Sequence, residues 1–222
     1  RFTVSTNISN TINLVARDGE ILWVGAFLSP QYAGYYKTAM TVINMVLMPI
    51  NPFIDTTYVE MMRAIAKSNW ELLKKLLKKI TTVSFVWTVS AFLGLLLLGK
   101  QLLFTEWEFL DRTFHIFSAE YLPAYPIILI LMVGYGIANV LFWNRTLLLS
   151  FSKADTATWI SFWGMLLKVL GSLWLLSRMP YYTEAILMSL YLAGTVLLMT
   201  FIGLSHLRAV TRDKPHSADL IK

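Results

Sequence analysis

Residues 80–99 read ITTVSFVWTVSAFLGLLLLG, twenty consecutive positions without a charged side chain. A helix that crosses the hydrocarbon core of a bilayer needs about 20 predominantly apolar residues. The apolar positions are continuous and do not alternate with polar ones, which excludes a strand of a membrane β-barrel. The segment is therefore predicted to cross a membrane as a helix.

Five further stretches have the same length and apolar character, and we predict an all-α, polytopic membrane protein with six transmembrane helices. Only 14% of the residues are charged and 56% are hydrophobic, whereas soluble domains carry about a quarter of charged residues. The chain has no cysteine, so disulfides and thiolate metal sites are excluded. The predicted six-helix unit covers 1–206, a polar cytoplasmic tail covers 207–222, and the spans lie at about 5–28, 35–59, 80–99, 123–149, 156–177 and 183–206.

The distribution of Lys and Arg predicts how the helices are oriented. With a cytoplasmic N-terminus, 13 of the 19 basic residues fall in inside segments and four in outside segments. Cytoplasmic loops carry the excess of Lys and Arg, so both ends are predicted to face the cytoplasm, in the cytoplasmic (inner) membrane. The basic residues flank the apolar runs, as at an anionic membrane surface, and no nucleic-acid partner is expected. Residues 71–80, ELLKKLLKKI, are predicted to lie on that surface as an amphipathic helix. A helix that binds a partner is the alternative.

The first predicted span carries a polar stripe. Asn10, Asn13, Arg17 and Glu20 are spaced by three, four and three residues, which places them on one helix face, with Asp18 at its edge. Each charge near the bilayer centre costs roughly 2.5–3.5 kcal/mol. An internal Arg17–Glu20 ion pair would neutralise two charges, but it does not account for the asparagines. We predict that the stripe lines a protein cavity.

Two other spans contain polar residues that could face the same cavity. In the second span, Asn44 precedes and Asn51 lies within an interruption expected at Pro49 and Pro52. In the fifth span, Lys168 is predicted to point inward near the middle of the helix, because a lysine side chain reaches only about 6 Å toward an interface. A simple kink and a snorkelling lysine are the alternatives.

The fourth span is predicted to pack closely against its neighbours. Tyr135, Asn139 and Trp143 share one face, and Gly134 permits a neighbouring helix to approach. Motifs for a catalytic nucleophile or a phosphate-binding loop are absent, and the three histidines have no metal-ligand spacing. No catalytic residues, metal site or cofactor are therefore expected.

Three motifs resemble a known family. The run ARDGEILWVGAFLSP at 16–30 is followed by AGYYKTA at 33–39, and AEYLPAYP occurs at 119–126. They are similar to motifs of the polysaccharide and lipid-linked oligosaccharide flippases, within the multidrug/oligosaccharidyl-lipid/polysaccharide exporter superfamily. In those proteins an acidic residue, a short aliphatic run, glycine and a "vGyY…A" signature open a repeat, and the matching acid is Glu20.

The resemblance implies two six-helix lobes around a central cavity, with this chain as the C-terminal lobe of a longer protein and a missing N-terminal lobe as its partner. Such proteins move an undecaprenyl-pyrophosphate-linked oligosaccharide across the membrane by alternating access, coupled to H⁺ or Na⁺. By this resemblance Arg17 would meet the pyrophosphate, while Asp18 and Glu20 would handle the coupling ion. Lys168 lies outside the motifs that carry this resemblance.

Two alternatives to a flippase remain. A drug/cation antiporter of the same superfamily would have an acidic, aromatic cavity without essential cations. A membrane-embedded glycan polymerase or ligase would be an enzyme and would carry a large outer loop, whereas the longest outer segment here, 100–122, has about twenty residues. A transporter is therefore the favoured prediction.

Overall fold

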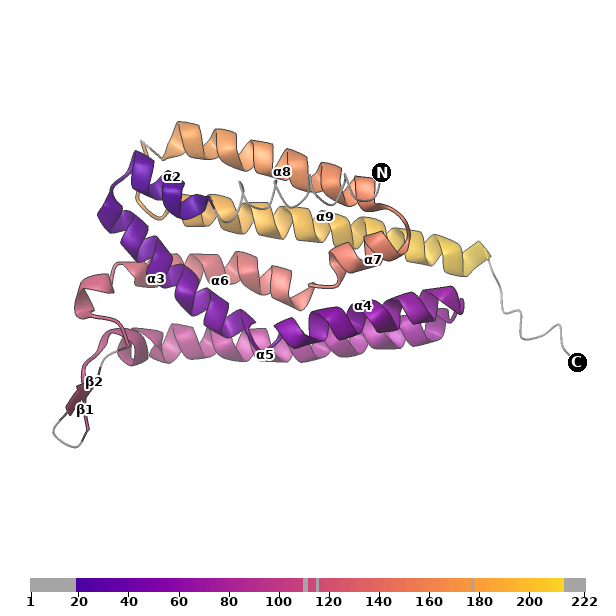
Figure 1. The fold of residues 1–222 in the computed structure, drawn as a ribbon, viewed down its shortest axis with the longest axis horizontal. Coiled ribbons are helices and arrows are strands. Elements are labelled where there is room, and N and C mark those ends of the chain that lie inside the picture. Colours follow the sequence, from indigo (N-terminus) through magenta and orange to yellow (C-terminus); the bar gives the residue numbers. More distant parts are fainter. Residues whose placement is uncertain (1–18, 110–111, 115, 177, 214–222) are drawn as a thin grey trace, which may run out of the picture.

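A computed structural model describes residues 19–109, 112–114, 116–176 and 178–213. Nearly all of this part of the chain is helical (Figure 1). A short antiparallel hairpin, in which Trp107 pairs with Phe114, is the addition to the predicted all-α fold. The elements are α2 (Glu20–Phe27), α3 (Pro30–Leu47), α4 (Asn51–Ala66), α5 (Trp70–Phe104), β1 (Trp107–Phe109), β2 (Arg112–Phe114), η2 (Ala119–Tyr121), α6 (Ala124–Val140), α7 (Asn144–Ser150), α8 (Ala154–Leu175) and α9 (Thr183–Asp213).

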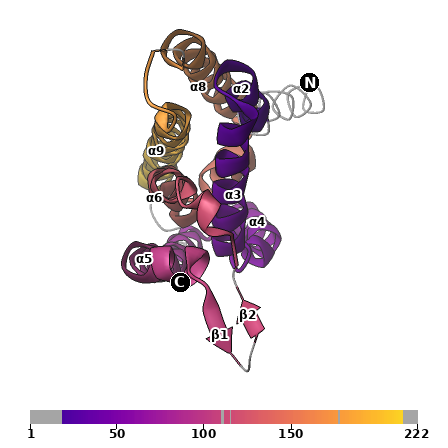
Figure 2. The same ribbon diagram turned by 90° about the vertical axis from the view of Figure 1, so that its left-hand side faces the viewer.

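The helices form two adjacent rows. Seen from one end, α8, α9, α6 and α5 follow one another in the first row, and α2, α3 and α4 lie beside them in the second (Figure 2). The main hydrophobic core lies where the rows meet, around Tyr36 and Ile43 of α3 and Ile128 and Leu131 of α6. Segments far apart in the sequence, α2 and the α8–α9 pair, therefore come together at one end of the bundle.

Four helical segments among the described residues are long and apolar enough to cross a membrane: α5, the 124–150 segment containing α6 and α7, α8, and α9. Large apolar side chains point away from the bundle, with Leu97 74%, Leu167 70% and Phe201 70% exposed. Apolar surface of this extent is unfavourable in water but fits lipid chains. The chain is a membrane protein.

The other two predicted spans are not among these four segments. Most of the first, at about 5–28, lies outside the described residues. The second, at about 35–59, is divided between α3 and α4, which are separated by a turn at 48–50. Pro49 lies in that turn and Pro52 in the first turn of α4, where the missing N–H groups favour a break. The count of six helices is not confirmed, and the two-lobe arrangement stays a prediction.

Helix α5 corrects the prediction of a surface helix at 71–80. The structure has one 35-residue helix from Trp70 to Phe104, about 52 Å long at 1.5 Å per residue, and it is straight in Figure 1. The amphipathic segment thus continues the line of the membrane span. Its apolar face packs on protein, because Leu73 and Leu77 are buried in a cluster with Met61 and Ala64 of α4.

Two other predicted boundaries differ from the structure. The span at 123–149 breaks between α6 and α7 at 141–143, without a proline or glycine. There the carbonyl oxygen of Leu141 accepts two hydrogen bonds from Asn144, one from its backbone N–H at 2.9 Å and one from its side-chain amide at 2.6 Å, which close the turn. At the other end of the chain, α9 continues to Asp213, so the first residues of the predicted tail are helical.

Helix α6 packs closely on both neighbours, which confirms its predicted packing role. Asn139 donates to Thr88 of α5 at 2.9 Å, and the Trp143 indole donates to Thr81 of α5 at 2.8 Å. On the α9 side, a Cβ atom at Gly134 would lie 2.4 Å from the Cα atom of Ser189. The absence of a side chain at position 134 therefore sets the distance between α6 and α9.

We expect Gly134→Ala to lower the free energy of unfolding by about 1–3 kcal/mol, because the new methyl group forces α6 and α9 apart. Gly94→Ala is the matched control, since a Cβ there meets nothing within 4 Å and alanine is the better helix former. Reversible unfolding in mixed detergent micelles measures both. Equal stability of the two variants would contradict the close packing.

Candidate functional site: a buried ionic cluster

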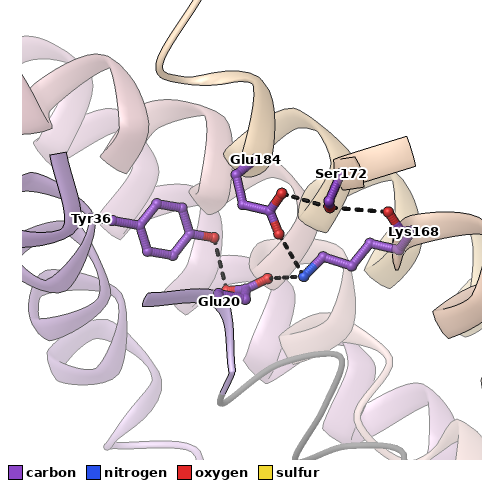
Figure 3. Close-up of polar contacts among 5 residues, drawn as sticks. All are labelled: Glu20, Tyr36, Lys168, Ser172 and Glu184. Atoms are coloured by element: carbon purple, nitrogen blue, oxygen red, sulfur yellow. Dashed lines mark hydrogen bonds and ion pairs between the residues drawn. The ribbon is translucent and has the colours of Figure 1, made fainter. Parts of the chain in front are cut away.

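A lysine bridges two carboxylates inside the bundle. The Lys168 ammonium of α8 lies 2.9 Å from Oε1 of Glu20 in α2 and 2.7 Å from Oε1 of Glu184 in α9. Figure 3 shows the ammonium pointing between the two carboxylates. Helix α2 is thus joined to the sequence-distant α8–α9 hairpin by one charged group, here called the Lys168 cluster.

The second oxygen of each carboxylate also has a partner. The Tyr36 hydroxyl of α3 donates to Glu20 Oε2 at 2.8 Å, and the Ser172 hydroxyl of α8 donates to Glu184 Oε2 at 2.7 Å (Figure 3). The charged side chains are 2% exposed for Lys168 and 0% for both glutamates. Because removing ions from water costs several kcal/mol for each ion, such a group persists only when every oxygen and proton is satisfied.

Local structure explains how these side chains reach one another. Lys168 lies two turns before α8 ends, and Glu184 lies in the first turn of α9, so the antiparallel hairpin brings them to the same level. The N-terminus of α9 favours a carboxylate there. Gly164 lets the helices approach, since a Cβ at that position would lie 2.5 Å from Thr195. Lys168 is nearer the middle of α8 than its end and is buried, as the sequence predicted.

The structure brings together two of the predicted site residues, Glu20 and Lys168. It adds Glu184, which the sequence analysis missed because it treated position 184 only as the start of a span. The charge of Glu184, opposite to that of Lys168 in the preceding span, was the available signal. The other predicted positions are not part of the cluster: Asn44 and Asn51 are exposed on α3 and α4, and Asn10, Asn13, Arg17 and Asp18 lie outside the described residues.

A groove of about 480 Å³ runs between α8 and α9 and has Lys168 in its wall. Its other lining residues are mainly apolar and include Leu167, Leu187 and Tyr191. The cluster therefore lies just inside the lipid-facing surface of the hairpin. In the part of the chain that the structure describes, no group of three His, Cys, Asp or Glu residues could hold a metal ion. Its two carboxylates are groups at which another cation could replace the Lys168 ammonium.

The fold and this cluster define a polytopic helical membrane protein with an ion-paired interior. Residues 1–105, a little under half of the chain, match the model of a family described as polysaccharide biosynthesis protein. The matched stretch includes Glu20, Tyr36 and the helices α2 to α5. No curated protein and no solved structure matches the chain. The similarity supports a membrane role in polysaccharide biosynthesis.

Proposed function

We propose that this chain is part of a flippase that moves a lipid-linked oligosaccharide, of the undecaprenyl-pyrophosphate type, across the cytoplasmic membrane by alternating access. The match of residues 1–105 to polysaccharide biosynthesis proteins carries the choice of substrate class. A membrane protein in that process has either to build the glycan or to move it. The absence of a catalytic motif in the sequence favours movement.

The Lys168 cluster supports coupling of this movement to an ion. Glu20 and Glu184 share one lysine, so an incoming H⁺ or Na⁺ competes with the ammonium for the same oxygens. Binding of that ion at Glu20 weakens the tie between α2 and the α8–α9 hairpin. Glu20 bound to Lys168 and Glu20 bound to the ion would be the two states that alternating access requires. The ion shifts the balance between them because it binds one state more tightly than the other. Asp18 is proposed to assist Glu20.

The substrate is proposed to meet the polar stripe of the first span. Arg17 binds the diphosphate in bidentate fashion, and Asn10 and Asn13 bind glycan hydroxyls. Asn44 and Asn51, which are exposed on α3 and α4, face a second lobe that completes the cavity. Lys168 acts on the substrate indirectly, through Glu20. Both termini of the segment are proposed to be cytoplasmic.

Glu20→Gln tests the coupling. The glutamine oxygen can accept from the Lys168 ammonium while its NH2 group donates to the Tyr36 hydroxyl oxygen, and Glu184 keeps its carboxylate for Lys168, so we expect the variant to fold. We expect glycan export to fall several-fold and to lose its response when the ion gradient is collapsed. The measurement is labelled surface glycan in cells that depend on this protein, alongside the lipid-linked precursor left on the inner leaflet.

Glu120→Gln is the matched control, because Glu120 is exposed in η2 and has no role in the cluster. It should export glycan as the wild type does. Wild-type export and gradient response in Glu20→Gln would refute the coupling role. Normal surface glycan in cells without the protein would refute the flippase itself.

A further inference from the structure

The first turns of α5 carry a strongly basic face. Lys74, Lys75, Lys78 and Lys79 are all exposed, and Leu73 and Leu77 on the opposite side are buried against α4. No ion pair joins any of these lysines to another residue that the structure describes. Like charges spaced by three and four residues repel one another, and Glu71 is the one acidic residue in residues 71–80, so this face has a net positive charge and attracts anions.

The depth of the lysines in the membrane indicates which anions are near. The uncharged run of α5 begins at Ile80 and is long enough to fill the hydrocarbon core. At 1.5 Å per residue, Lys79 then lies about 2 Å and Lys74 about 9 Å outside the edge of the hydrocarbon core, measured along the helix. The headgroup region occupies about 5–7 Å on each side of the core. The basic face therefore lies at the level of lipid phosphates.

A groove of about 210 Å³ between α4 and α5 begins at this level. Lys79 contributes to its wall, and the apolar side chains of Phe53, Val83 and Phe142 line it. Glu60 also lines the groove, but its carboxylate is held by Arg63 at 2.7 Å. Lys79 thus places a cation at one end of a groove that also has apolar side chains in its wall, and an anionic amphipathic lipid requires both.

We propose that the α4–α5 groove binds an anionic phospholipid. Lys75 and Lys79, one turn apart on the same side of α5, hold the headgroup phosphate, and part of one acyl chain lies along Phe53 and Val83. Charge complementarity carries the choice of an anionic over a zwitterionic lipid, since each Lys near an anionic surface contributes about 1 kcal/mol. The proposal does not depend on the flippase assignment.

The test uses the full chain in detergent with equimolar phosphatidylglycerol and phosphatidylcholine of identical acyl chains, and native mass spectrometry counts the retained lipids. The wild type should retain phosphatidylglycerol preferentially. In Lys75→Gln/Lys79→Gln, the ratio of retained phosphatidylglycerol to phosphatidylcholine should fall about fivefold for each lysine removed. Lys37→Gln/Lys100→Gln, which removes two exposed lysines elsewhere, should keep it. Val83→Trp, which fills the groove, should shorten the retention of both lipids.

Three outcomes would overturn the proposal. The first is equal retention of the two lipids by the wild type. The second is the same loss of preference in both double variants, which would reduce the effect to overall charge. The third is displacement of phosphatidylglycerol by farnesyl diphosphate from the wild type but not from Lys75→Gln/Lys79→Gln, which would make the groove a diphosphate-substrate site.

Discussion

Lys168→Met should lower the free energy of unfolding by about 3–5 kcal/mol, because it leaves two buried carboxylates without their shared cation. Methionine matches the length of the lysine stem, so the loss reflects the missing charge and not a cavity. Glu20 keeps its Tyr36 partner and Glu184 its Ser172 partner, but neither hydrogen bond replaces a charge. Unfolding in mixed detergent micelles measures the effect, with the exposed Lys100→Met as control.

The triple variant Glu20→Gln/Lys168→Met/Glu184→Gln should recover most of that loss. Replacing a whole buried ionic group by hydrophobic residues of similar volume is often neutral or stabilising, whereas removal of one partner is strongly destabilising. The glutamines likewise remove both negative charges, and each keeps a hydrogen-bonding neighbour in Tyr36 or Ser172. If Lys168→Met were as stable as the wild type, the ammonium would not be neutralising these carboxylates. If the triple variant were no better than Lys168→Met, the cost would lie in packing and not in charge.

Sequence alone predicted the spans of α5, α8 and α9 because their length and apolar character are set by the thickness of the bilayer. It placed the interruption at Pro49 and Pro52 for a similarly local reason, the missing N–H of proline. The break between α6 and α7 has no such marker. The turn is closed by Asn144, whose backbone and side chain both donate to Leu141, and asparagine occurs in many positions where no helix breaks.

The prediction for 71–80 failed because amphipathicity shows that one face is covered but not what covers it. A membrane surface and the neighbouring helix α4 give the same pattern of leucines, and here Leu73 and Leu77 pack on α4. The distinction depends on tertiary contacts. It also changes the position of the lysines, which stand along a helix projecting from the membrane span.

Of the candidate site, the sequence predicted Glu20 and Lys168 but not their pairing with each other or with Glu184. Glu20 and Lys168 stood out because charges within apolar runs are costly, and this cost does not depend on the fold. Their pairing across 148 positions requires that α2 lies against the α8–α9 hairpin, which no local pattern reveals. Glu184 could have been found by searching the adjacent span for a charge opposite to that of Lys168, since the two helices are joined by a short turn.

Arg17→Gln should abolish export of the lipid-linked glycan while the protein still inserts into the membrane. In the proposed function, a diphosphate that crosses the hydrocarbon core needs a fixed cation in a shielded cavity, and the other cation of this region, Lys168, is bound by two carboxylates. Arg17 precedes Glu20 by three residues in the sequence, so substrate and coupling ion would be handled close together. Surface glycan and accumulated lipid-linked precursor are the two quantities to measure.

Lys37→Gln is the control, because it removes an exposed cation from α3 and should leave export intact. Export at the wild-type level in Arg17→Gln would remove Arg17 from the proposed mechanism. Transport of cationic dyes that survives both Arg17→Gln and Lys168→Met would instead favour a drug/cation antiporter, since such a protein needs acidic residues but neither of these two cations. The two substitutions thus separate a cavity that attracts anions from one that attracts cations.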